Sequence, residues 1–153
     1  QNWSFCHNGQ IPHFAKIRRQ LEATLPDALY ARRKGSTDSE LIFLTLLAHG
    51  LKFDPQQAVA ATLNAIGPDR SDGPIKLTLV FSDGDRLCAF RHASAGPAPT
   101  LYVSGVLDNG GRAVASEPLC GVAENWTALP SNALCMVTAS GWETATITGL
   151  IAA

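Results

Sequence analysis

The sequence predicts an α+β fold in which antiparallel strands follow a helical segment. Apolar residues recur at helical spacing from Ile11 to Ile66, whereas short apolar runs separated by turn sequences fill the chain from Ile75 onward. Helices and strands that occupy separate stretches, without strict alternation, are typical of α+β folds with mostly antiparallel pairing. The 153 residues suffice for one domain and are too few for two ordinary ones, so we expect one domain over residues 1–153.

Three helices are expected in the first half of the chain. Thr37 and Glu40 form the Thr-x-x-Glu pattern of a capping box, and Asp54 followed by Pro55 is a typical helix start. Gly50 ends the second helix, which is apolar nearly all round and should be the most buried. The expected helices cover residues 11–25, 37–50 and 54–67, with a loop at 26–36.

Short strands are expected at the start of the chain and throughout its second half. Turns that contain Gly84, Gly110 and Gly141 separate apolar runs, which is the pattern of β-hairpins. We expect a first strand at 3–6 and hairpins that pair 77–81 with 87–90, 101–106 with 113–116, and 133–138 with 144–151.

Charge and composition exclude several classes of function. A net charge of −1 and a pI near 6.4 mean that the chain has no excess of positive charge with which to bind nucleic acid or an anionic membrane. No apolar stretch approaches the roughly 18 residues that cross a bilayer, and no signal-peptide pattern opens the chain, so we expect a cytoplasmic protein. The four cysteines are widely spaced, which predicts buried, reduced thiols. We expect neither a metal nor a cofactor.

The stretch from Cys6 to Gly9 carries the first candidate chemistry. Neighbouring side chains on a strand point to opposite faces, so Cys6 and His7 cannot form a catalytic dyad. Asn8 and Gly9 could hold a developing oxyanion, because an amide donates hydrogen bonds and glycine permits close approach. Alternatively, Asn-Gly only makes the turn between a strand and the first helix.

Two other stretches allow a functional and a purely structural interpretation. Asp38, at the start of the second helix, could bind the ammonium group of a ligand, or could only complement the helix dipole. Ser116, Glu117 and Pro118 end a predicted strand upstream of Trp126. They either place polar groups beside a site or only terminate that strand.

Taken in order, these stretches resemble the class II glutamine amidotransferases, which use an N-terminal cysteine as nucleophile. Residues 4–9 resemble the family's strand end in His-Asn-Gly, and residues 35–40 its helix start in Ser/Thr-Asp-Ser/Thr-Glu. The Ala-Ser-Glu-Pro-Leu at 115–119, with Trp126, resembles a segment of the small single-domain branch that includes the ergothioneine-pathway amidohydrolase. The likeness covers nearly the whole chain but only the C-terminal part of the family's domain.

The resemblance implies a four-layer αββα Ntn-hydrolase sandwich whose N-terminal strands are not on this chain. It also implies hydrolysis of a γ-glutamyl amide, as in a glutaminase or in the first step of an amide-nitrogen transferase. Asn8 and Gly9 would form the oxyanion hole, and Asp38 would hold the α-amino group of glutamine. We place His7 and Ser116 with Asp38 in the substrate site, although the ring of His7 also suits a structural role.

The implied chemistry needs a cysteine at residue one, because its free α-amine serves as the base. Residue one here is Gln1, and Cys6 is internal. We therefore expect an upstream segment or a second polypeptide in a heteromer to supply the nucleophile, and the chain alone to be inactive. Two alternatives stay open: a non-catalytic amidotransferase-like binding or regulatory subunit, and a cysteine hydrolase that uses Cys6 or another thiol.

Overall fold

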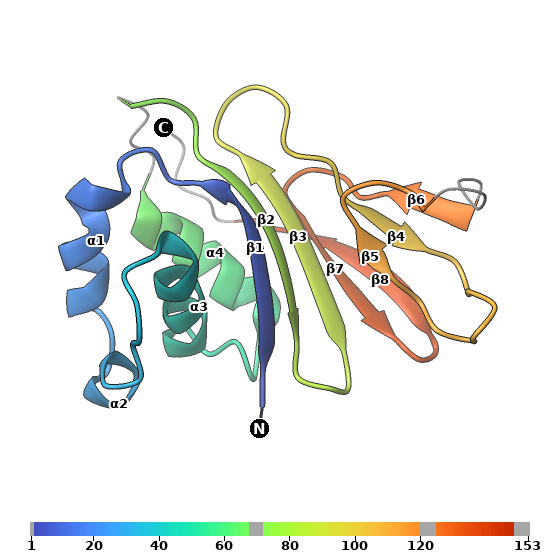
Figure 1. Ribbon diagram of the computed structural model, residues 1–153, viewed down its shortest axis with the longest axis horizontal. Coiled ribbons are helices and arrows are strands. Elements are labelled where there is room, and N and C mark those ends of the chain that lie inside the picture. Colours follow the sequence, from blue (N-terminus) through green and yellow to red (C-terminus); the bar gives the residue numbers. More distant parts are fainter. Residues whose placement is uncertain (1, 68–71, 120–124, 149–153) are drawn as a thin grey trace. The chain divides into compact units, whose positions relative to one another are not determined.

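The computed structural model describes residues 2–67, 72–119 and 125–148 (Figure 1), which group into two compact units. The sheet unit contains residues 2–9, 76–119 and 125–146. The helical unit contains residues 10–67, 72–75 and 147–148. Among the described residues all helices lie in the helical unit, and the strands pair antiparallel in the sheet unit. The expected α+β class is therefore confirmed.

The helical unit is built around helix α3 (Asp38–Ala48), which contacts α1 (Phe14–Ala23), α2 (Asp27–Tyr30) and α4 (Pro55–Ile66). Helix α3 is apolar on nearly every side, as expected from its sequence. Its N-cap is Thr37, and that of α4 is Asp54, so both predicted helix starts are confirmed. The buried side chains of α3 are Leu41, Ile42, Leu44, Thr45 and Leu46.

Two details of the helical unit differ from the sequence prediction. Helix α1 begins at Phe14 and not near Ile11, because the chain first makes a turn in which Phe14 N–H donates to Ile11 C=O at 3.0 Å. The predicted loop at 26–36 contains the short helix α2, in which the C=O of Pro26 accepts from Tyr30 N–H at 2.9 Å. A single helical turn is too short to give a periodic apolar pattern.

The sheet unit holds two sheets. The five-stranded sheet has the order β1-β2-β3-β7-β8, and the three-stranded sheet has the order β5-β4-β6 (Figure 1). The predicted hairpins are confirmed, with Ser82 opposite Leu87 and Tyr102 opposite Ala115 as registered pairs. The strands are β1 (Ser4–Gln10), β2 (Lys76–Ser82), β3 (Leu87–Ala93), β4 (Tyr102–Ser104), β5 (Val114–Ala115), β6 (Trp126–Ala128), β7 (Ala133–Thr138) and β8 (Gly141–Thr146).

Three strand predictions need correction. Strand β1 runs to Gln10, four residues beyond its predicted end at Cys6. Strand β8 begins at Gly141 and not at Thr144, because the pairing of Thr138 with Gly141 closes a tight turn. Strand β6 is too short to have been expected. Strand β8 ends at Thr146, so the predicted strand is wrong at 147–148, and its predicted end at 149–151 lies outside the described residues.

An apolar cluster contains residues from both sheets of the sheet unit. Its members come from the five-stranded sheet, from the three-stranded sheet and from the segments that flank β4 and β6. Packing of two sheets through their inner faces is the usual way for antiparallel sheets to bury apolar area. The buried members are Ala89, Leu101, Val103, Leu129, Cys135 and Val137.

None of the described helices is both long enough and apolar enough to span a membrane. Within the same described ranges, no group of three or more His, Cys, Asp or Glu side chains could hold a metal ion.

Candidate functional site

Gly9 occupies a place in strand β1 that no other residue type can fill. Its φ is +149°, in the region that L residues with a side chain rarely adopt. A Cβ atom at this position would overlap the backbone carbonyl of Lys76 on the neighbouring strand β2 and would lie 3.1 Å from Nε2 of His7. The glycine therefore lets two backbones approach closely within a sheet, and the turn interpretation of Asn8-Gly9 is wrong because both residues belong to β1.

The side chains of β1 alternate between two environments. Phe5 and His7 are half-buried, whereas Ser4, Cys6 and Asn8 are exposed. Cys6 and His7 therefore point to opposite faces, as predicted, and do not form a thiol–imidazole pair. Asn8 lies on the exposed face of the strand.

The prediction that the thiols are buried is wrong for Cys6, which is exposed on the same face of β1 as Asn8. Cys88 and Cys135 are buried, and burial raises the pKa of each thiol to about 11. Cys120 lies outside the described residues.

Asp38 is the first residue of α3 and is half-buried. Its Oδ1 accepts a hydrogen bond from Ser39 N–H at 2.8 Å and lies 3.4 Å from the Ser39 hydroxyl. Oδ2 has no hydrogen-bond partner among the described residues. One oxygen thus orients the carboxylate, and the other remains available to a ligand.

The capping box predicted for Thr37 and Glu40 is only half correct. Thr37 Oγ1 accepts from Glu40 N–H at 3.2 Å, as predicted. The Glu40 carboxylate does not return this bond to Thr37; it accepts from Lys34 N–H at 2.6 Å and Gly35 N–H at 2.7 Å. A sequence pattern fixes which residues can cap a helix, but the path of the preceding loop decides which N–H groups the glutamate reaches.

Ser116 follows β5 directly and is exposed, as is Glu117. Ser116 therefore lies just beyond the three-stranded sheet, whereas His7, Asn8 and Gly9 lie together on β1 in the five-stranded sheet of the same unit. Asp38 belongs to the helical unit. The predicted site residues therefore come from three separate elements of the chain, of which only β1 carries more than one.

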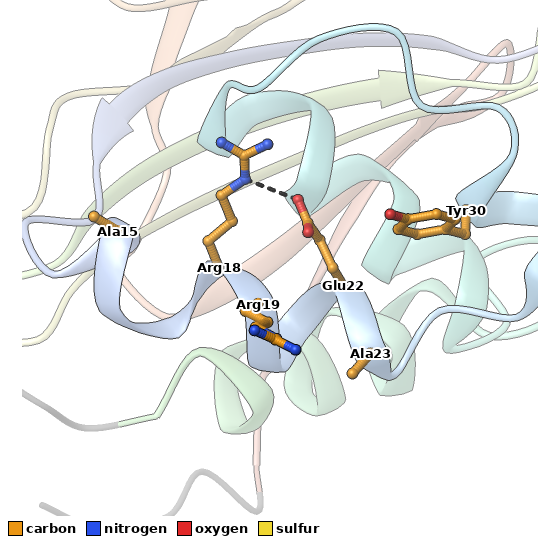
Figure 2. Close-up of a pocket in the computed structure, with 6 residues that line it drawn as sticks. All are labelled: Ala15, Arg18, Arg19, Glu22, Ala23 and Tyr30. Atoms are coloured by element: carbon orange, nitrogen blue, oxygen red, sulfur yellow. Dashed lines mark hydrogen bonds and ion pairs between the residues drawn. The ribbon is translucent and has the colours of Figure 1, made fainter.

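A surface hollow of about 570 Å³ in the helical unit was not expected from the sequence. Figure 2 shows the hydrogen bond between Arg18 and Glu22 of α1, and Tyr30 of α2 and Arg19 also line the hollow. Glu22 Oε1 accepts from Arg18 Nε at 2.8 Å and from Arg33 Nη1 at 2.6 Å. The guanidinium of Arg33 also lies 5.2 Å from the centre of the Tyr30 ring. This network ties α1 to the segment that follows α2.

The hydrogen bond from Arg18 holds the pKa of Glu22 below its ordinary value of 4.5. Burial opposes this shift, and the charge of Arg33 reinforces it. The carboxylate is therefore ionised at neutral pH and balances two guanidinium groups at once.

Residues 1–103 match the family model of the class II glutamine amidotransferases, which is more than half of the chain. The chain belongs to this family. A solved structure of a glutamine aminotransferase class-II domain protein from Silicibacter pomeroyi is similar over 96% of the amidotransferase chain, at 36% identity and a TM-score of 0.85. The match covers 68% of that protein.

More distant structures share the fold of this amidotransferase chain. A glutamine phosphoribosylpyrophosphate amidotransferase from B. subtilis is 15% identical over 97% of the chain, with a TM-score of 0.63. A predicted glutamine amidotransferase from Pseudomonas aeruginosa is 22% identical over 92% of the chain, with a TM-score of 0.56. The chain spans 30% and 59% of these proteins, respectively. These similarities confirm the Ntn-hydrolase type of fold predicted from the three motifs. No curated protein sequence matched the chain.

Proposed function

We propose that this chain forms the part of a class II glutamine amidotransferase domain that binds a γ-glutamyl amide and stabilises the oxyanion during its hydrolysis. Residues 1–153 would be one partial domain, and a cysteine from an upstream segment or a second polypeptide would be the nucleophile. Family membership supports glutamine chemistry in general terms. The observation that carries the assignment of the site is the exposed amide of Asn8 beside a glycine that tolerates no side chain.

The proposed reaction proceeds through a thioester. The cysteine thiolate attacks the γ-carbonyl carbon, and the oxyanion that forms accepts hydrogen bonds from the Asn8 side-chain amide and the Gly9 backbone N–H. The C–N bond then breaks, and the amide nitrogen takes up a proton and leaves as ammonia. Water hydrolyses the thioester, which gives glutamate and restores the thiol.

Asp38 would bind the α-ammonium group of the substrate. Its Oδ1 is held by Ser39, whereas Oδ2 has no partner in the described part of the chain, so the carboxylate is oriented before the ligand arrives. Preorganised charge of this kind lowers the entropy lost on binding. His7 and Ser116 complete the proposed substrate site; Nε2 of His7 lies 3.1 Å from the position that a Cβ atom on residue 9 would occupy.

Replacement of Asn8 by alanine tests the oxyanion role. In the full-length protein, Asn8→Ala should lower kcat for glutamine hydrolysis by roughly 10²–10³, with little change in KM, because the donor acts only when charge has developed. Glutamate release under saturating glutamine measures kcat. Cys6→Ser is the matched control on the same face of β1 and should retain turnover. Loss of turnover in Cys6→Ser, with activity kept in Asn8→Ala, would transfer the chemistry to the internal thiol.

Replacement of Asp38 by asparagine tests the substrate-binding role. Asparagine still suits a helix N-terminus, so the free energy of unfolding should change little. A charged hydrogen bond contributes about 1.5–3 kcal/mol, so KM for glutamine should rise about 10- to 150-fold. A lower Tm together with an unchanged KM would reduce Asp38 to a residue that only complements the helix dipole.

A further inference from the structure

The carboxylate of Glu40 binds two consecutive backbone N–H groups of the loop that precedes α3. One oxygen accepts from Lys34 and the other from Gly35, at 2.6 and 2.7 Å. Both distances are short, as expected when an ionised carboxylate accepts from an amide. The side chain of the helix therefore holds the incoming loop at two adjacent points.

The backbone of Glu40 is held in turn by the same loop. Its N–H donates to Thr37 Oγ1 at 3.2 Å, so the segment from Lys34 to Glu40 closes on itself through three hydrogen bonds. Only Ser36 and Thr37 separate the bound Gly35 from Asp38. The two carboxylate bonds hold the loop on the N-terminal side of Asp38, so substrate binding has less backbone freedom to remove, whereas the Thr37 bond caps the helix.

We propose that Glu40 is a positioning residue for Asp38: by holding Lys34 and Gly35, it fixes the loop so that the Asp38 carboxylate meets the substrate's ammonium group. This inference rests on the substrate-binding role proposed above for Asp38. Glu40 itself, with both oxygens engaged by the loop, does not touch the ligand.

The ionisation of Glu40 is consistent with this role. The hydrogen bond from Lys34 N–H lowers the pKa of Glu40 below its ordinary value of 4.5, and burial opposes that shift. The Gly35 N–H and the charges of Arg33 and Lys34 act in the same direction as the main hydrogen bond. The carboxylate thus accepts from both N–H groups at neutral pH.

The test compares Glu40→Gln with Thr37→Ala in the full-length protein. Glutamine has nearly the shape of glutamate, but one of its two terminal atoms is a donor, so it cannot accept one N–H group on each terminal atom as the carboxylate does. Glu40→Gln should raise KM for glutamine about tenfold and change kcat less than about threefold, since the loss lies in substrate binding. Thr37→Ala removes the helix cap and keeps both loop bonds, so its KM should change less than about twofold. Equal KM values for the two variants overturn the proposal.

Two further measurements separate this proposal from the function on which it rests. In Asp38→Asn/Glu40→Gln, KM should rise less than the product of the two single effects, because both act through one carboxylate; fully multiplicative effects overturn the inference. If Asp38→Asn raises KM and Glu40→Gln does not, the positioning role fails and the proposed function stands. If Asp38→Asn leaves KM unchanged, both fail.

Amide hydrogen exchange at Lys34 and Gly35 should accelerate in Glu40→Gln, and unchanged exchange excludes the loop contact.

Discussion

Strand β1 and the start of helix α3 both carry proposed site residues, but different parts of the sequence hold them in place. Gly9 is constrained by the backbone of Lys76, which lies far along the chain and reaches Gly9 only when β1 and β2 pair. The Asp38 carboxylate is held by Ser39, and the loop before it is held by the bonds of Glu40 to Lys34, Gly35 and Thr37, all of them neighbours in sequence. The first arrangement depends on the assembled sheet, whereas the second can form with the helix itself.

This difference has an energetic consequence. A long-range contact between two backbones cannot relax without moving a strand, because packed interiors leave no free volume. A local loop can adjust its dihedral angles at modest cost. We therefore expect substitution of Gly9 to affect the folded state and substitutions around α3 to affect mainly binding.

Gly9→Ala should produce the largest loss of stability. Overpacking costs about 1–3 kcal/mol and a strained φ costs a similar amount, so we expect the free energy of unfolding to fall by roughly 2–6 kcal/mol. Urea unfolding measures this quantity. Gly84→Ala is the control, because Gly84 also has a positive φ, +99°, but a Cβ there would have no atom within 4 Å. Equal losses in the two variants would show that the approach to Lys76 contributes nothing.

Glu22→Gln should lower the free energy of unfolding by less than Gly9→Ala does, and the size of this effect should depend on pH. Because the folded-state pKa of Glu22 lies below 4.5, its carboxylate stabilises the protein above that pH, and the stabilisation is lost as pH falls through the folded-state pKa. The variant should be less stable than the parent protein at neutral pH, and the difference should shrink in acid. Urea unfolding midpoints of both proteins, at neutral pH and at about pH 3, measure this difference in stability. A difference that is constant with pH would mean that the Arg18 and Arg33 contacts do not depend on the charge of Glu22.

Cys6→Ser should have the smallest effect on stability, within about 0.5 kcal/mol, because the side chain is exposed. The same exposure predicts that a thiol-alkylating reagent modifies Cys6 in the native protein. Cys88 and Cys135 are buried with pKa values near 11 and should react only after unfolding. Peptide mapping by mass spectrometry locates each modification. Native-state labelling of Cys88 or Cys135 would contradict the described core of the sheet unit.

The features that the sequence predicted correctly depend on neighbouring residues. The N-caps Thr37 and Asp54 each receive a backbone N–H from three residues later, and this spacing is visible in the sequence. The turn at Gly84 sets the pairing of Ser82 with Leu87 in the same way. The order of the three motifs was enough to predict the family, which the family model and the Silicibacter pomeroyi structure confirm.

The tertiary structure decided the features that involve distant or competing partners. Asn8-Gly9 is compatible with a turn until β2 pairs with β1 and extends the strand to Gln10. Glu40 had a plausible partner in Thr37, but the loop brings Lys34 and Gly35 N–H groups closer. A local pattern states which hydrogen bonds are possible, and only the folded backbone determines which of the possible partners lies within reach.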